Sequence, residues 1–225
     1  MIKICMVGTG YVGLVSGACM ADFGHRVTCV DIDPERIANL HQGIMPIYEP
    51  GLDRLVEKNT SEGRLHFTDN LAEGLAGADV AFVAVQTPMS ESGEADLQYV
   101  LQVGRQIGEL MDRYLVVVTK STVPVGTNRI LREVITEAQK TPVDFDQASN
   151  PEFLREGSSI EDFMRPDRVV IGVETERAEE LMRAIYRPLY LLDTPMVTTG
   201  IETAELIKYA SNSFLAVKIS FINEI

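Results

Sequence analysis

Basic side chains are scarce in this chain. Its 225 residues hold 20 Lys and Arg against 33 Asp and Glu, which gives a formal net charge of −13. Nucleic acids and acidic membranes attract basic surfaces, and the sequence contains no basic patch. Both classes of partner are therefore excluded. An anionic ligand would have to be held by helix N-termini and a few local Lys or Arg side chains.

Long hydrophobic runs are also missing. No stretch reaches the roughly 18 apolar residues that a membrane-spanning helix needs. The first residues, Met1-Ile2-Lys3, lead directly into a strand pattern, which leaves no room for a signal peptide. We therefore expect a cytoplasmic protein without a membrane segment.

Cysteine and histidine are rare, with three of each. The cysteines are odd in number and occupy apolar strand and helix positions, so we interpret them as reduced core thiols. The histidines are scattered along the chain, so no metal site is expected. These residues are Cys5, Cys19, Cys29, His25, His41 and His66.

The most informative stretch is a glycine turn that follows an apolar run and opens a helical pattern. Strand, glycine turn and helix in this order form the phosphate cradle of a dinucleotide-binding fold. Gly8 permits a sharp turn, Gly10 lets a pyrophosphate approach the backbone, and Gly13 lets the helix pack close to the strand. Free N–H groups of the first helical turn then face the anion. The turn consists of Gly8, Thr9, Gly10, Tyr11, Val12 and Gly13.

A second apolar run, over 26–30, ends in Asp31, 18 residues after Gly13. An acid at this place accepts hydrogen bonds from the hydroxyls of the adenosine ribose, which favours NAD over NADP. Arg36 follows in the next helix. Two interpretations of Arg36 remain open, a contact with the adenosine end of NAD and a solvated helix charge.

Strand and helix patterns alternate as far as residue 198. The continuous apolar runs 80–85 and 114–118 are typical of inner parallel strands. We expect residues 1–198 to form one α/β domain, a Rossmann-type, doubly wound and mostly parallel sheet. Residues 199–225 are predicted to begin a long connecting helix, which is apolar on more than one face and must be covered by something else. Further strands are expected at 2–7, 26–30, 65–67, 145–149, 169–171 and 195–197, and helices at 14–23, 52–59, 69–75, 96–111, 128–139 and 178–186.

Polar side chains follow several of the predicted strands, where ligands of this fold bind. Thr87 and Thr122 are therefore placed near a cofactor. Glu152 and Glu156 are four residues apart and would share one face of a helix. They are either two solvated acids or the place of a general base, and the residues alone leave both readings open.

Lys208 and Asn212 are also four residues apart, on the last predicted helix. They are either buried polar groups satisfied by neighbours or a pair that points into a cleft. A buried lysine needs a partner or a purpose, which favours the cleft.

Taken together, several stretches resemble the UDP-glucose/GDP-mannose dehydrogenase family, whose members oxidise the C6 alcohol of a sugar nucleotide to an acid. The resemblance extends over almost the whole chain and keeps the family's order. It implies NAD-dependent oxidation of UDP-glucose to UDP-glucuronate. A GDP-mannose 6-dehydrogenase and a non-catalytic NAD-binding or dimerisation module are the alternatives. The matching stretches are 8–13, 47–52, 120–127, 150–157, 166–172, 208–212 and 221–225.

The resemblance also implies roles for individual residues. Glu152 would act as acid–base, Thr122 would help to hold a water, Lys208 would stabilise an oxyanion, and Asn212 would bind near the reacting carbon. The implied NAD contacts are positions 8–13, Asp31, Arg36, Thr87 and Thr122, with Glu156 on the nicotinamide side. The implied substrate contacts are Glu152, Phe153, Leu154, Arg155, Glu156, Lys208 and Asn212.

Two departures from the family pattern stand out. The family's cysteine, which holds the substrate as a thiohemiacetal and then a thioester, lies beyond the lysine helix, and none of the three cysteines here matches it. Gln86 occupies a place where glycine is frequent and could crowd the cofactor. We expect an N-terminal piece of a longer enzyme that lacks the UDP-binding domain, binds NAD without turnover, and forms a homodimer or higher homo-oligomer through the helix from Ile201.

Overall fold

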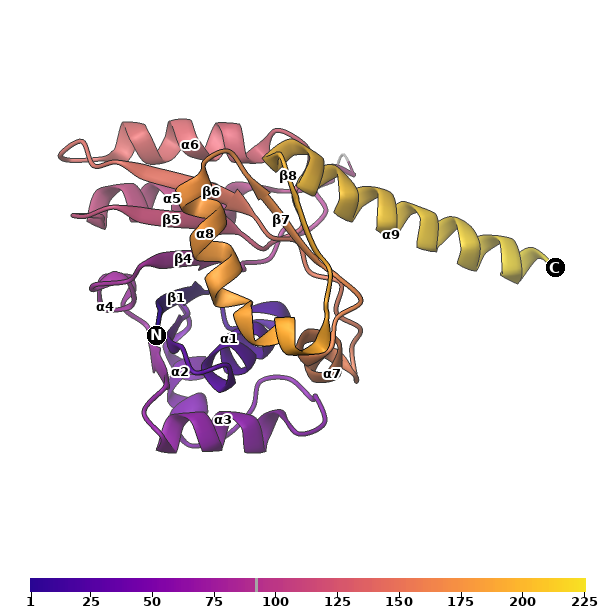
Figure 1. The fold of residues 1–225 in the computed structure, drawn as a ribbon, viewed down its shortest axis with the longest axis horizontal. Coiled ribbons are helices and arrows are strands. Elements are labelled where there is room, and N and C mark those ends of the chain that lie inside the picture. The colour runs from indigo at the N-terminus through magenta and orange to yellow at the C-terminus, as the bar shows by residue number, and fades with distance from the viewer. Residues whose placement is uncertain (92) are drawn as a thin grey trace.

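A mostly parallel sheet forms the centre of the molecule (Figure 1). The computed structural model describes residues 1–91 and 93–225, and within them the sheet has eight strands in the order β3-β2-β1-β4-β5-β6-β7-β8. Neighbouring strands run parallel except β6 and β7, which are antiparallel. The strands are β1 Lys3–Val7, β2 Arg26–Val30, β3 Leu65–Thr68, β4 Val80–Val83, β5 Leu115–Thr119, β6 Phe145–Ser149, β7 Val169–Val173 and β8 Met196–Thr199.

Helices cover both faces of the sheet because inner strands expose apolar side chains on both sides. Phe82 of β4 contributes to one buried cluster with helix α1, whereas its neighbours Ala81 and Val83 contribute to the other with helix α5. The expected doubly wound α/β class is confirmed. The helices are α1 Tyr11–Asp22, α2 Pro34–His41, α3 Leu52–Ser61, α4 Leu71–Leu75, α5 Gln98–Leu110, α6 Thr127–Ala138, α7 Ser159–Met164, α8 Glu176–Ile185, the 3-10 helix η1 Arg187–Leu192 and α9 Ile201–Glu224.

The three cysteines are buried free thiols within the two clusters. Burial raises the pKa of each thiol, so all three stay protonated at neutral pH. Their interpretation as reduced core residues is confirmed. Within residues 1–91 and 93–225, no helix combines the length and the apolar character that crossing a membrane requires.

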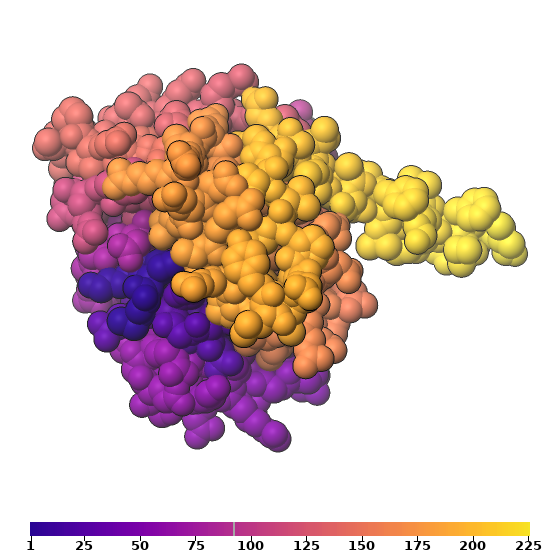
Figure 2. Space-filling model, in the orientation of Figure 1, coloured from indigo at the N-terminus to yellow at the C-terminus, as the bar shows by residue number. Residues whose placement is uncertain are grey.

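Helix α9 leaves the body of the molecule after its first two turns. Ile201, Ala204, Glu205 and Lys208 are buried, and nearly all of its remaining length projects away from the sheet (Figures 1 and 2). Apolar side chains on the projecting part are exposed, as the sequence pattern predicts. They are Phe214, Leu215, Val217, Ile219, Phe221, Ile222 and Ile225.

Candidate functional site

The glycine turn joins β1 to α1, and its three glycines meet different surroundings. A Cβ on Gly8, whose φ is +103°, would lie 2.6 Å from the carbonyl oxygen of Ala84. A Cβ on Gly13 would lie 1.9 Å from the carbonyl oxygen of Gly8. A Cβ on Gly10 would meet no atom within 4 Å. The sharp turn at Gly8 and the close helix packing at Gly13 are therefore confirmed, and the backbone at Gly10 is open to a ligand.

Asp31, at the end of β2, is tied to the same turn. Its Oδ2 accepts hydrogen bonds from the N–H of Thr9 (2.8 Å) and from its hydroxyl (2.7 Å), and Arg36 Nη1 lies 3.1 Å away. Burial alone would raise the pKa of the Asp31 carboxyl, but these donors and the N–H of Asp33 lower it. Asp31 is thus held ionised, and Arg36 is an ion-pair partner rather than a solvated charge.

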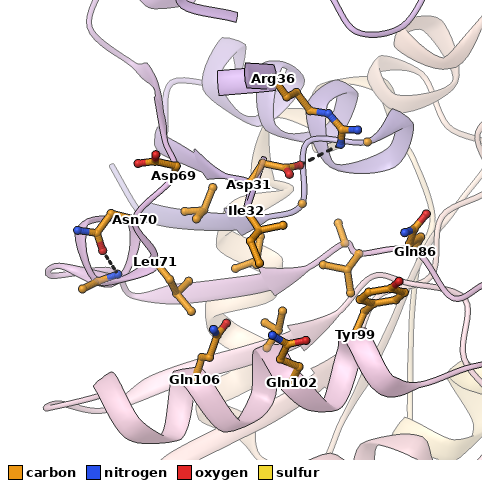
Figure 3. A pocket seen from close by; sticks show the side chains of 18 of the residues that line it. Asp31, Ile32, Arg36, Asp69, Asn70, Leu71, Gln86, Tyr99, Gln102 and Gln106 are labelled. Atoms are coloured by element: carbon orange, nitrogen blue, oxygen red, sulfur yellow. Dashed lines mark hydrogen bonds and ion pairs between the residues drawn. The ribbon is translucent and has the colours of Figure 1, made fainter. Parts of the chain in front are cut away.

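A cavity of about 690 Å³ opens beside the turn, in the size range of small-molecule sites. Gly8, Gly10, Asp31 and Arg36 are among the residues that line it. Figure 3 shows Tyr99, Gln102 and Gln106 of α5 across from Asp31 and Arg36, and Gln86 also lines the cavity.

The sequence pattern does not identify the three α5 side chains as site residues, because the apolar face dominates the pattern of that helix. Their spacing, at i, i+3 and i+7, places them on one face of the helix, and this spacing is the feature of the sequence that indicates a shared site. Thr87 is absent from the residues that line this cavity, and its hydroxyl instead donates to the carbonyl oxygen of Thr122 at 2.9 Å.

Lys208 and Glu152 form a shielded ion pair between α9 and the loop after β6. Lys208 Nζ donates to Glu152 Oε1 at 2.8 Å and to the Glu152 carbonyl oxygen at 2.6 Å. The two side chains are only 9% and 13% exposed. Glu152 Oε2 also accepts from the N–H of Leu154. Lys208 is thus buried and paired, whereas Asn212 is exposed on the projecting part of α9. Their joint role in a cleft stays a prediction.

The shared helical face that the spacing of Glu152 and Glu156 predicts is not formed. The segment 150–157 is irregular, since the Glu152 carboxylate binds its own loop and Gly157 has a φ of +87°. Glu156 is exposed. The intervening side chains have structural contacts: Phe153 lies under the Arg168 guanidinium, Leu154 packs against the core, and Arg155 pairs with Asp162.

A second lysine, Lys120, holds the other end of this loop and was not singled out in the sequence as a site residue. Its Nζ donates to Asn150 Oδ1 at 3.1 Å, and Asn150 also accepts from the Tyr186 hydroxyl. The pKa of Lys120 is lowered to about 8, mainly because the group is buried; the Glu152 charge opposes this shift and the Lys208 charge adds to it. Two cations therefore face the segment 150–152.

Glu49, in the loop before α3, joins the glycine turn to the same region. It accepts from the Tyr11 hydroxyl and from the N–H groups of Gly157 and Ser159, both at 2.9 Å. Burial would raise the pKa of Glu49, but these donors lower it. The sequence showed only a Pro- and Gly-rich loop here, so this buried carboxylate had no signal beyond its match to the family stretch 47–52.

The strand order, the glycine turn open at Gly10 and the ionised acid after β2 define a Rossmann-type dinucleotide-binding protein. Residues 2–190 match the model of the UDP-glucose/GDP-mannose dehydrogenase family, NAD binding domain, and residues 202–225 match the family's central domain. The chain belongs to the UDP-glucose/GDP-mannose dehydrogenase family and carries its NAD-binding domain.

Similar proteins support this assignment. The UDP-glucose 6-dehydrogenase of Rhizobium meliloti is 56% identical, and the match covers 100% of this chain and 52% of that protein. A UDP-glucose dehydrogenase structure from Pyrobaculum islandicum is 44% identical, with a TM-score of 0.94 and coverage of 100% and 52%. A GDP-mannose dehydrogenase structure from Pseudomonas aeruginosa is 37% identical, with the same TM-score and coverage. The chain thus spans about half the length of these relatives.

Proposed function

We propose that this chain is the NAD-binding part of a UDP-glucose 6-dehydrogenase, which oxidises UDP-glucose to UDP-glucuronate. The observation that carries the proposal is the pairing of Lys208 with Glu152 at the carboxyl ends of the parallel strands, the edge where the turn at Gly10 also lies. A dinucleotide cradle and a shielded base–cation pair at one edge suit an NAD-dependent oxidation of an alcohol.

The cradle residues fit NAD. The pyrophosphate would approach Gly10 and the N-terminus of α1, and Asp31 would accept hydrogen bonds from the adenosine ribose. The cavity beside Tyr99 would take the adenine ring. Thr122 and Glu156 are proposed for the nicotinamide side. When bound, NAD supplies the hydride acceptor for the substrate's C6 carbon.

The residues proposed for catalysis stabilise charge and accept protons. Lys208 would stabilise negative charge that develops on the substrate oxygen, since it is a shielded cation. Glu152 would accept a proton or activate a water, with help from Thr122. Asn212 would complete the site by contacting the substrate once α9 is covered, and the loop 152–156 would contact the sugar. The substrate's sugar and base would be recognised mainly outside this chain.

GDP-mannose is the second candidate substrate. The fold matches the Pseudomonas aeruginosa GDP-mannose dehydrogenase as well as it matches the Pyrobaculum islandicum enzyme, with a TM-score of 0.94 for both. Sequence identity favours UDP-glucose, at 44% against 37%. Assembly into homodimers or higher homo-oligomers through α9 is part of the same proposal, because its exposed apolar side chains need cover.

Calorimetry with NAD tests the cofactor role. We expect NAD to bind, NADP to bind more weakly, and Asp31→Ala to weaken NAD binding by at least about tenfold, since the ribose acceptor is lost. Asp53→Ala removes an exposed acid from α3 and is the matched control. No NAD binding by the unmodified chain would contradict the proposal.

Turnover tests the catalytic role. In a form of the protein that oxidises UDP-glucose, Lys208→Ala should lower kcat by about 100-fold or more, because a charge at the reacting oxygen is removed. Supplying GDP-mannose instead of UDP-glucose separates the two candidate substrates. A near-normal rate with Lys208→Ala would remove the proposed role of this lysine.

A further inference from the structure

Helix α9 carries two buried charged side chains within its first two turns. Each one is hydrogen-bonded to a different loop at the strand ends. Counted over the whole residue, Glu205 is 2% exposed and Lys208 is 7% exposed. Lys208 binds the loop after β6 through Glu152. Glu205 binds the loop after β5, which carries Thr122. One rigid stretch of helix therefore contacts both loops of the proposed catalytic site.

Glu205 receives its hydrogen bonds from the beginning of α6. Its Oε2 accepts from the N–H of Gly126 at 2.7 Å. Its Oε1 accepts from the N–H of Asn128 at 2.9 Å and from the Asn128 side-chain amide at 2.8 Å. Helix α6 has no cap from its own N-cap residue, Gly126, so a carboxylate from another helix takes that place.

Asn128, which binds Glu205, also connects the two ends of the loop that carries Thr122. The Asn128 amide oxygen accepts from the hydroxyl of Thr119, the last residue of β5, at 2.7 Å. The loop between Thr119 and Asn128 is thus closed by a side-chain bond, and Glu205 joins that closure to α9. In the middle of the loop, the Thr122 carbonyl accepts from Thr87.

We infer that Glu205 is a positioning residue that sets where Thr122 lies relative to the Lys208–Glu152 pair. This inference rests on the proposed function, since it concerns the same site. A carboxylate is required because all three groups that face it are N–H donors. In Glu205→Gln the amide offers one oxygen, and its NH2 group would face a backbone N–H, so the loop and α9 would separate.

NADH is the probe for this inference, because emission of its dihydronicotinamide ring reports the surroundings of that ring. We expect Glu205→Gln to bind NADH with a Kd within about threefold of the unmodified chain, since the cradle at Gly10 is untouched. Emission of the bound ring should fall toward that of free NADH. Glu202→Gln, an exposed acid one turn earlier on α9, is the matched control and should keep both values. A general loss of structure would change the Kd as well, which separates it from a positioning role.

NMR of the ligand-free chain tests the inference independently of cofactor binding. In Glu205→Gln the signals of the Thr122 amide and the Lys208 ammonium should both shift, and in Glu202→Gln neither should. If Glu205→Gln does not fold, Asn128→Ala, which removes one donor to Glu205, should shift the same two signals. Unchanged Thr122 and Lys208 signals in the folded variant would overturn the inference, as would unchanged emission of bound NADH. Failure of the unmodified chain to bind NADH would instead contradict the proposed function.

Discussion

Lys120 and Lys208 hold opposite ends of one three-residue segment. Lys120 donates to the side chain of Asn150, and Lys208 donates to the carboxylate and carbonyl of Glu152. Lys208 is paired with a carboxylate, whereas the hydrogen-bond partner of Lys120 is a neutral amide. Lys120 therefore carries the cost of burial, and its pKa falls to about 8.

The depressed pKa of Lys120 predicts a pH-dependent stability. Between about pH 8 and its unfolded value of 10.5, the unfolded chain binds a proton that the native chain has released. The free energy of unfolding therefore gains from this group as pH rises through that window. Relative to Lys120→Met, the unmodified chain should gain about 2.5 kcal/mol from about pH 7 to about pH 10 in urea denaturation. The prediction would be contradicted if the free energies of unfolding of the unmodified chain and Lys120→Met changed in parallel with pH.

The ion pair of Lys208 and Glu152 should be strongly coupled. Lys208→Met leaves a shielded carboxylate, and Glu152→Gln leaves a shielded ammonium, so each should lower the free energy of unfolding by about 3 kcal/mol. The double variant should cost less than the sum by about 1–3 kcal/mol, because neither charge then lacks its partner. Urea denaturation of the unmodified chain, the two single variants and the double variant gives the four free energies of unfolding for this double-mutant cycle. Strict additivity would show that the pair contributes nothing as a pair.

Gly10 and Gly13 should separate ligand binding from folding. Gly10→Ala places a methyl group in open space at an ordinary φ of −68°, so stability should change by less than about 0.5 kcal/mol. NAD affinity should nevertheless fall by at least about tenfold, because the methyl group occupies the approach of the pyrophosphate.

Gly13→Ala is the counterpart. Its methyl group would collide with the Gly8 carbonyl oxygen, so the chain should lose about 3 kcal/mol or more of stability. Thermal unfolding and calorimetry measure the two effects separately. Normal NAD affinity in Gly10→Ala would place the ligand elsewhere.

Glu49 should stabilise the segment 157–159 only while it is ionised. Its pKa is lowered from 4.5 in the folded chain, so its contribution is present above that value and is lost as pH falls through the lowered one. Glu49→Gln should cost about 2 kcal/mol at neutral pH and speed amide exchange at Gly157 and Ser159. Glu57→Gln, an exposed acid on α3, is the control. Equal acid sensitivity of the unmodified chain and Glu49→Gln would refute the assignment.

The sequence predicts the cradle well because its signals are local. Gly8, Gly10 and Gly13 have spacing that one turn geometry requires, and Asp31 ends the next strand. The helical reading of Glu152 and Glu156 failed because a side chain that hydrogen-bonds its own loop competes with helix formation. The other contacts of the site depend on tertiary structure. Nothing near Glu205 or Glu49 in the sequence shows that their partners lie 79 and 108 positions away.

The contact between Tyr11 and Gly157 spans 146 positions of the chain. The cradle around Gly10 needs little more than the first 31 residues and their neighbouring strands, whereas the loop of Glu152 is fixed by residues that leave the ribosome much later. Closing such distant contacts carries a large loop entropy and slows folding. We therefore expect the nucleotide cradle to form early during synthesis and the loop opposite it to order last, so that a nascent chain could acquire its cofactor before its chemistry is assembled.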